Sequence, residues 1–125
     1  METDDGHQRK ITVLLCELLG TALFIYGVIM TGSAAGIPFS LLFSTLIFGA
    51  VTGGHFNPAV SLGVFISEGN YSKNVRLLVL LWIGQFLGGA LAIGLAYLSL
   101  YETRPPPTKV PAELVPRLCP EQYPE

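Results

Sequence analysis

The fold is decided by residues 52–61, which read T-G-G-H-F-N-P-A-V-S and interrupt an otherwise apolar part of the chain. The two glycines permit tight backbone turns. Asn57 is a residue type that favours the cap of a helix N-terminus, and Pro58 suits the first helical position. The apolar residues 58–66 that follow would form a helix about 13 Å long, roughly half the thickness of a bilayer. This pattern predicts a loop that enters a membrane and a half-helix that starts near the membrane's midplane.

Charged side chains are absent from long parts of the chain. They make up 13% of the 125 residues, and none lies in residues 18–67 or 77–101, while the mean hydropathy is +0.54. A soluble domain has about twice that share of charges and exposes too much surface to leave such stretches uncharged. The composition therefore predicts an integral membrane protein, and no basic patch indicates a nucleic-acid partner.

Three apolar runs have the length of membrane-spanning helices or approach it. They cover about residues 11–30, 37–52 and 75–101, and the second is short for a span. Together with the half-helix at 58–66 they predict an all-α membrane protein with three transmembrane helices and one re-entrant half-helix. The polar residues 1–10 are expected to lack regular structure, and residues 102–125, with seven of the nine prolines, to form a loop or tail.

The orientation of these spans rests on a small charge difference. With a cytoplasmic N-terminus, four basic residues lie inside and three outside, which agrees weakly with the positive-inside rule. Residues 1–10 are then a cytoplasmic segment and the sequon at Asn70 stays unglycosylated, whereas the inverted topology would expose the sequon to glycosylation. The first apolar run is long for a signal peptide, so cleavage after it is the disfavoured alternative.

The two cysteines leave a second alternative open. Cys16 lies in an apolar run and Cys119 in the proline-rich tail, so two unrelated thiols are favoured over a disulfide.

The loop at residues 53–57 has the chemistry of a pore wall. Non-helical backbone at membrane depth has to be buried in protein or line a wet cavity. If it lines a pore, the carbonyl groups of Gly54 and His55 accept hydrogen bonds from a solute, and the Asn57 amide donates one. The positive end of the half-helix would repel cations and protons. The alternative is an ordinary Gly-Asn-Pro turn between two short helices.

Three segments resemble the aquaporin, or major intrinsic protein, family in the same order. They are GGHFNPAVS at 53–61, ELLGTALF at 17–24 and QFLGGA at 85–90. The resemblance implies that residues 11–101 are one half of the family's inverted repeat. It also implies a pore motif at Asn57, Pro58 and Ala59, and a pore-lining loop at Gly53, Gly54 and His55.

The resemblance implies further roles outside the loop. Ile37 falls at a position of the family's selectivity filter, and Glu17 at a buried glutamate that supports the loop. From the residues alone, Glu17 is either such a group or a side chain near a helix end that reaches the interface. Gln85 either bridges helices or faces the lumen. Small residues let helices approach closely, and this assigns packing roles to Gly20, Gly84 and Gly88.

The sequence departs from the family in having one Asn-Pro-Ala motif and no second half. It is either a fragment of a longer channel or a short protein that needs a partner. We expect a multi-pass protein of the plasma membrane or an organelle that passes water or small neutral solutes as a homo-oligomer or with a second channel half. The alternative is a truncated, non-conducting protein that associates with full-length channels. No catalytic residues, metal site or cofactor are expected.

Overall fold

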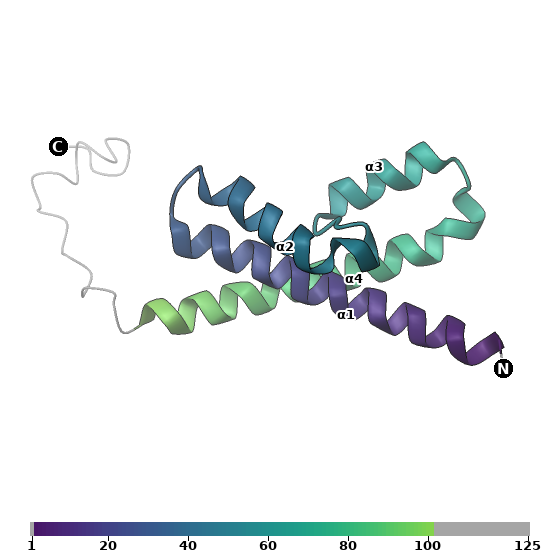
Figure 1. The fold of residues 1–125 in the computed structure, drawn as a ribbon, viewed down its shortest axis with the longest axis horizontal. Helices are drawn as coiled ribbons and strands as arrows, with labels where there is room; N and C mark the ends of the chain where they lie inside the picture. The colour runs from purple at the N-terminus through teal and green to yellow at the C-terminus, as the bar shows by residue number, and fades with distance from the viewer. Residues whose placement is uncertain (1, 102–125) are drawn as a thin grey trace, which may run out of the picture.

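The computed structural model describes residues 2–101, and their side chains from Gln8 onward. This part of the chain is all-helical and contains four helices (Figure 1). They are α1 (Glu2–Thr31), α2 (Gly36–Thr52), α3 (Pro58–Glu68) and α4 (Tyr71–Tyr101). The helices α1 and α4 contain apolar stretches long enough to cross a membrane, at Gln8–Thr31 and Tyr71–Tyr101. The all-helical prediction is confirmed.

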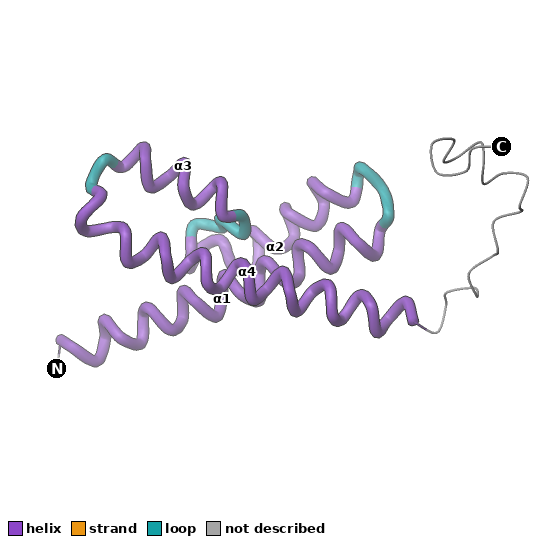
Figure 2. The backbone as a smooth tube through the Cα atoms, turned by 180° about the vertical axis from the view of Figure 1, so that it is seen from behind, coloured by secondary structure: helices purple, strands orange, loops and turns teal. Residues whose placement is uncertain are grey.

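The two long helices cross each other, and the two short helices lie on one side of this pair (Figures 1 and 2). The helix α1 packs on α4 and α2, and α3 packs on α4. Both short helices have one end near the middle of the molecule, where the loop 53–57 joins them. Their other ends point to opposite ends of the molecule, with α3 running toward the end that carries the N-terminus.

Glycines permit the close approach of α1 and α4. A Cβ atom at Gly84 would lie 2.9 Å from the Leu14 carbonyl oxygen, and one at Gly88 would overlap the Leu18 carbonyl oxygen. These glycines are four residues apart and so share one face of α4. Backbone packing of this kind holds helices together in a bilayer, where apolar side chains alone provide little driving force.

Glycines also end the two short helices. Gly53 adopts a left-handed conformation with φ of 86° after α2, and its N–H donates to the Gly49 carbonyl oxygen at 2.8 Å. Gly69 does the same after α3 with φ of 67°. A side chain at either position would strain this backbone. The short α3 is therefore bounded by local sequence at both ends.

The start of α1 differs from the prediction. The helix begins at Glu2, so the expectation that residues 1–10 lack regular structure is wrong from that residue on. The segment contains no proline and a single glycine, and acidic residues favour the first turn of a helix. The helical pattern of the apolar run therefore continues through the polar residues that precede it.

Two predictions fall partly or wholly outside the described residues. The proline-rich segment 102–125 lies outside them, and so does Cys119. Cys16 is a free thiol in the described part of the chain.

Candidate functional site

The loop between α2 and α3 has an unusual backbone. Gly53 and Gly54 have φ angles of 86° and 69°, and Phe56 has a φ of 44° although it carries a side chain. A left-handed conformation costs a residue with a Cβ atom about 1–2 kcal/mol. Within residues 2–101 Phe56 is the one non-glycine residue with a positive φ. The surrounding structure therefore has to hold it in place.

Phe56 is held from two sides. Its side chain is 2% exposed and lies against Gly20 of α1, where any Cβ atom would overlap the ring. Its backbone N–H donates to the Glu17 Oε2 atom at 3.0 Å. Gly20 and Glu17 are three residues apart and face the same way on α1. One face of α1 thus receives both the ring and the backbone of Phe56.

Glu17 lies in the interior of the molecule, with 0% of its side chain exposed, and does not reach a helix end. Besides the Phe56 N–H, its Oε2 atom accepts a hydrogen bond from Gln85 Nε2 at 2.7 Å. Gln85 belongs to α4 and is also buried. The pair joins the two crossing helices directly beneath the loop, so Gln85 bridges helices here.

Ser61 extends this network into the half-helix α3. Gln85 Nε2 donates to Ser61 Oγ at 2.8 Å, and Ser61 Oγ lies 3.1 Å from His55 Nδ1. Ser61 is 2% exposed. The sequence does not assign Ser61 a role, because its hydrogen bonds depend on residues 17, 61 and 85 meeting in space. The available signal was a polar serine in an apolar helix, one turn after the Asn57 cap.

Asn57 begins α3 as the pattern predicts. Its Oδ1 atom accepts the Ala59 N–H at 2.8 Å, its backbone is extended, and Pro58 occupies the first turn. The Pro58 carbonyl oxygen accepts a hydrogen bond from Trp82 Nε1 of α4 at 3.0 Å. Asn57 is exposed, and its side-chain NH₂ group has no partner among residues 2–101. The cap therefore leaves two N–H donors free at the N-terminus of the half-helix.

The carbonyl groups of the loop are free as well. In the described part of the chain, no donor contacts the carbonyl oxygens of Gly53, Gly54 or His55. The N–H group of Gly54 is occupied, because it donates to Thr52 Oγ1 at 3.1 Å. The N–H groups of Gly54 and Phe56 are thus bonded to side chains, whereas three successive carbonyl acceptors have no donor in the described part of the chain.

A cavity of about 780 Å³, here called the loop cavity, is lined in part by two of these three loop residues and does not include Gly54 or Asn57 in its lining. Its lining includes Gly53, His55 and Ser61. Charged residues from the beginning of α1 and from around the α3–α4 turn also line it, namely Arg9, Lys10, Glu68 and Lys73. The cavity therefore leads from the loop in the middle of the molecule toward its charged end.

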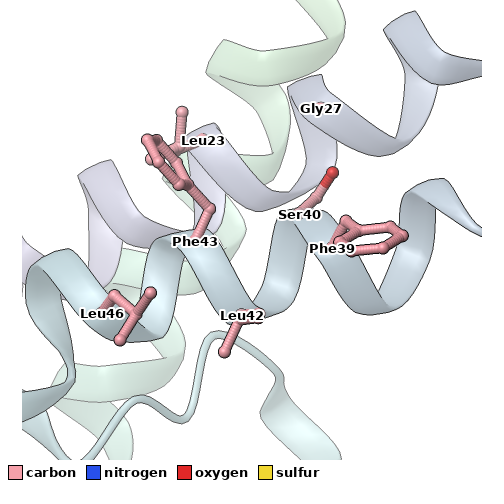
Figure 3. A pocket seen from close by; sticks show the side chains of 7 residues that line it. All are labelled: Leu23, Gly27, Phe39, Ser40, Leu42, Phe43 and Leu46. Atoms are coloured by element: carbon pink, nitrogen blue, oxygen red, sulfur yellow. The ribbon is translucent and has the colours of Figure 1, made fainter.

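A second hollow lies between α1 and α2, away from the loop cavity. Figure 3 shows the residues that line it, which are apolar apart from the Ser40 hydroxyl group. The hollow has a volume of about 360 Å³. Ser40 lies against Gly27, where a Cβ atom would come within 2.5 Å of its Oγ atom. This hollow marks another close helix contact and brings no group of solute-binding chemistry together.

The structure does not bring Ile37 to the loop. Ile37 is an exposed residue in the first turn of α2, whereas the loop follows the last turn. Ile37 lies 15 positions before Thr52, which is about 22 Å along the helix axis. A role of Ile37 in selectivity stays a prediction, as do the pore roles of the loop residues.

The comparisons with known proteins agree on one family. Residues 28–115 match the major intrinsic protein family. Aquaporin-8 of Notomys alexis is 35% identical over 111 residues, covering 78% of this chain and 41% of that protein. Aquaporin-8 of Rattus norvegicus is 34% identical over 111 residues, covering 78% of this chain and 40% of that protein. Aquaporin Z of Brucella melitensis is 32% identical over 80 residues, covering 64% of this chain and 34% of that protein.

The chain thus spans about two fifths of the length of the aquaporin-8 relatives that it matches. No solved structure is a significant match to it.

Proposed function

We propose that this chain, which belongs to the major intrinsic protein family, builds one half of a channel for water or small neutral solutes. Family membership and its apolar helices make it a multi-pass integral membrane protein. The proposal adds that α1, α2 and α4 cross the bilayer and that α3 is a re-entrant half-helix. It assigns no catalytic step, cofactor or metal to the chain.

The dimensions of α3 support the re-entrant arrangement. Its eleven residues are about 16 Å long, roughly half of a hydrocarbon core. The helix runs from the middle of the molecule to the end where Arg9, Lys10 and Lys73 line the loop cavity. If these charges mark the membrane surface, the N-terminus of α3 lies near the midplane. The positive-inside rule then places this end on the cytoplasmic side.

The observation that carries the proposal is the set of free hydrogen-bonding groups in the loop. Three successive carbonyl groups, from Gly53 to His55, and the Asn57 amide have no partner in the described part of the chain. Such groups cost several kcal/mol each when they face lipid. A pore solute satisfies both kinds of group at once, because water and similar neutral molecules donate and accept hydrogen bonds. The Asn57 position at the positive end of α3 disfavours cations there.

A solute column needs a wall on its other side as well. We propose that a second channel half supplies this wall, either from a longer chain or from a second copy in the opposite orientation. The exposed apolar residues of α2 and α3 support an arrangement surrounded by lipid and protein, and they include Phe39, Leu46, Val60 and Ile66.

The test is a chimera in which residues 1–101 replace the matching half of rat aquaporin-8. Swelling of vesicles that contain the chimera should exceed that of empty vesicles. Asn57→Asp should change water flux or proton exclusion, because it places a carboxylate beside the loop carbonyls. Asn70→Asp, in the turn between α3 and α4, is the matched control and should leave both unchanged.

The native chain expressed alone separates the two functional classes. No swelling from the chain alone, together with swelling from the chimera, supports a channel half that needs its partner. If the chimera folds and reaches the membrane but does not conduct, the channel proposal is wrong. A changed flux of a co-expressed full-length channel would then favour a non-conducting associate.

A further inference from the structure

A chain of hydrogen bonds connects Glu17, Gln85, Ser61 and His55, and its chemistry determines which atom donates in each bond. The three links measure 2.7, 2.8 and 3.1 Å and join α1, α4, α3 and the loop. Chemistry fixes the donor in the first two bonds, and these two bonds determine which atom donates in the third. The question is which nitrogen of the His55 ring carries the hydrogen, because imidazole nitrogens differ in what they offer to a solute.

The amide of Gln85 has one orientation that satisfies its neighbours. Its Nε2 atom has two hydrogens and lies within hydrogen-bond distance of both Glu17 Oε2 and Ser61 Oγ. A reversed amide would place an oxygen beside the Glu17 oxygen that already accepts the Phe56 N–H. Gln85 is therefore the donor in both bonds, and Ser61 Oγ is an acceptor.

Ser61 then has one hydrogen of its own to place. A hydroxyl group donates one hydrogen bond and accepts two. Within residues 2–101, His55 Nδ1 is the one further partner of the Ser61 hydroxyl group. If His55 donated from Nδ1 instead, the hydrogen of this 2% exposed hydroxyl would have no acceptor in the described part of the chain. An orphaned buried donor is costly, so Ser61 donates and Nδ1 accepts.

The other ring nitrogen faces a different environment. His55 is half-buried and lines the loop cavity. A Cβ atom at Gly53 would lie 3.3 Å from His55 Nε2, so this nitrogen lies close to Gly53, another residue that lines the cavity. Nε2 has no hydrogen-bond partner among the described residues. It is the ring atom available to a molecule in the cavity.

We propose that Ser61, oriented by Gln85, is a positioning residue that fixes His55 in the Nε2–H tautomer. His55 then presents a hydrogen-bond donor to the loop cavity, which Gly53 with its unpaired carbonyl group also lines. The arrangement selects small neutral solutes that have both a lone pair and an N–H or O–H hydrogen, such as water. This consequence for solutes rests on the proposed channel function, whereas the tautomer does not.

The tautomer is measured by ¹⁵N NMR of the histidine-labelled full chain in lipid bilayers, at a pH where the ring is neutral. The sequence has two histidines, and His7→Gln leaves His55 as the single signal. We expect an unprotonated Nδ1 and a protonated Nε2 in this background. Ser61→Thr keeps a hydroxyl group and should give the same spectrum. Ser61→Ala should raise the share of the Nδ1–H tautomer.

The matched control is Ser67→Ala. Ser67 lies on the same helix, is exposed, and donates to the Val64 carbonyl oxygen at 2.8 Å. It should leave the His55 signals unchanged. A protonated Nδ1 in the His7→Gln background overturns the proposal, and this reading does not depend on whether Ser61→Ala folds. A Ser61→Ala protein with the same tautomer shares as its parent overturns it too.

Transport is scored separately in the chimera. The expected result is a several-fold lower water flux for Ser61→Ala than for Ser61→Thr. A chimera that does not conduct while His55 keeps the Nε2–H tautomer refutes the channel and leaves the positioning role of Ser61 intact.

Discussion

Replacing Glu17 by leucine should destabilise the protein, because it removes the acceptor of two buried hydrogen bonds. The Glu17 Oε2 atom accepts two hydrogen bonds, from the Phe56 N–H at 3.0 Å and from Gln85 at 2.7 Å. Leucine fills a similar volume and accepts neither. Gln85 keeps its bond to Ser61, so one N–H of Gln85 and one of Phe56 are orphaned.

The two losses differ in size. A buried backbone N–H without an acceptor costs about 1–3 kcal/mol. A hydrogen bond between membrane helices contributes about 0.6 kcal/mol on average and at most about 1.7 kcal/mol, because the unfolded state in the membrane also finds partners. Together they predict a loss of roughly 2–5 kcal/mol for Glu17→Leu. Glu17→Gln retains an oxygen with two lone pairs that can accept both bonds, but it places an NH₂ group at the buried Oε1 position, which has no partner in the described part of the chain, so it should lose less than Glu17→Leu but not be neutral.

The assay is unfolding of the purified chain in mixed micelles by increasing SDS, followed by circular dichroism. Glu68→Leu is the matched control, because Glu68 is an exposed carboxylate on α3 whose partner is the nearby Asn74. Exposed substitutions of this kind change stability by about 0.5 kcal/mol or less. If Glu17→Leu unfolds at the same SDS content as Glu68→Leu and the wild type, the stability of the loop does not depend on this acceptor. If Glu17→Gln loses as much as Glu17→Leu, the number of acceptors is not the cause.

Two further predictions concern α4. Gly88→Ala should cost about 1–3 kcal/mol in the same assay, because the new methyl group overlaps the Leu18 carbonyl oxygen. Gly89→Ala, whose Cβ would meet nothing within 4 Å, should be neutral or slightly stabilising, and equal losses for both variants would contradict the packing argument. Trp82→Phe removes the hydrogen bond to the Pro58 carbonyl oxygen and should cost about 1 kcal/mol. A Trp82→Phe protein that unfolds at the same SDS content as the wild type would show that this bond does not anchor α3.

The sequence predicted those features that neighbouring residues determine. Asn57 caps α3 and Pro58 starts it, and the Asn57 Oδ1 bond to the Ala59 N–H confirms the cap. Family, membrane location and helical class also follow from short motifs and from the absence of charges. The beginning of α1 was missed because a polar segment without helix breakers looks the same whether or not it continues a helix. The apolar pattern that predicts this helix begins at Ile11 and gives no information about the polar residues before it.

The conformation of Phe56 had no signal in the sequence. A left-handed backbone is expected at Gly53 or Gly54, and phenylalanine rarely adopts it. It becomes possible here because Gly20 leaves room for the ring and Glu17 accepts the N–H group. Both residues lie more than thirty positions earlier in the chain. The role of Ser61 was hidden for the same reason, since its partners belong to the loop and to α4.

The positions of these hydrogen-bonded residues indicate which part of the proposed channel half would form without a second half. Within residues 2–101, the side chains of Glu17, Gln85 and Ser61 hold the loop, and Gly84 and Gly88 bring α1 and α4 close enough for them to meet. The chain therefore carries side chains that shape its own loop. The carbonyl groups of Gly53 and His55, two residues that line the loop cavity, have no donor among residues 2–101. Under the proposed channel function, a second half would enclose the solute but would not be needed to shape the loop, so the Phe56–Glu17 bond should be present in the isolated chain even where conduction is not.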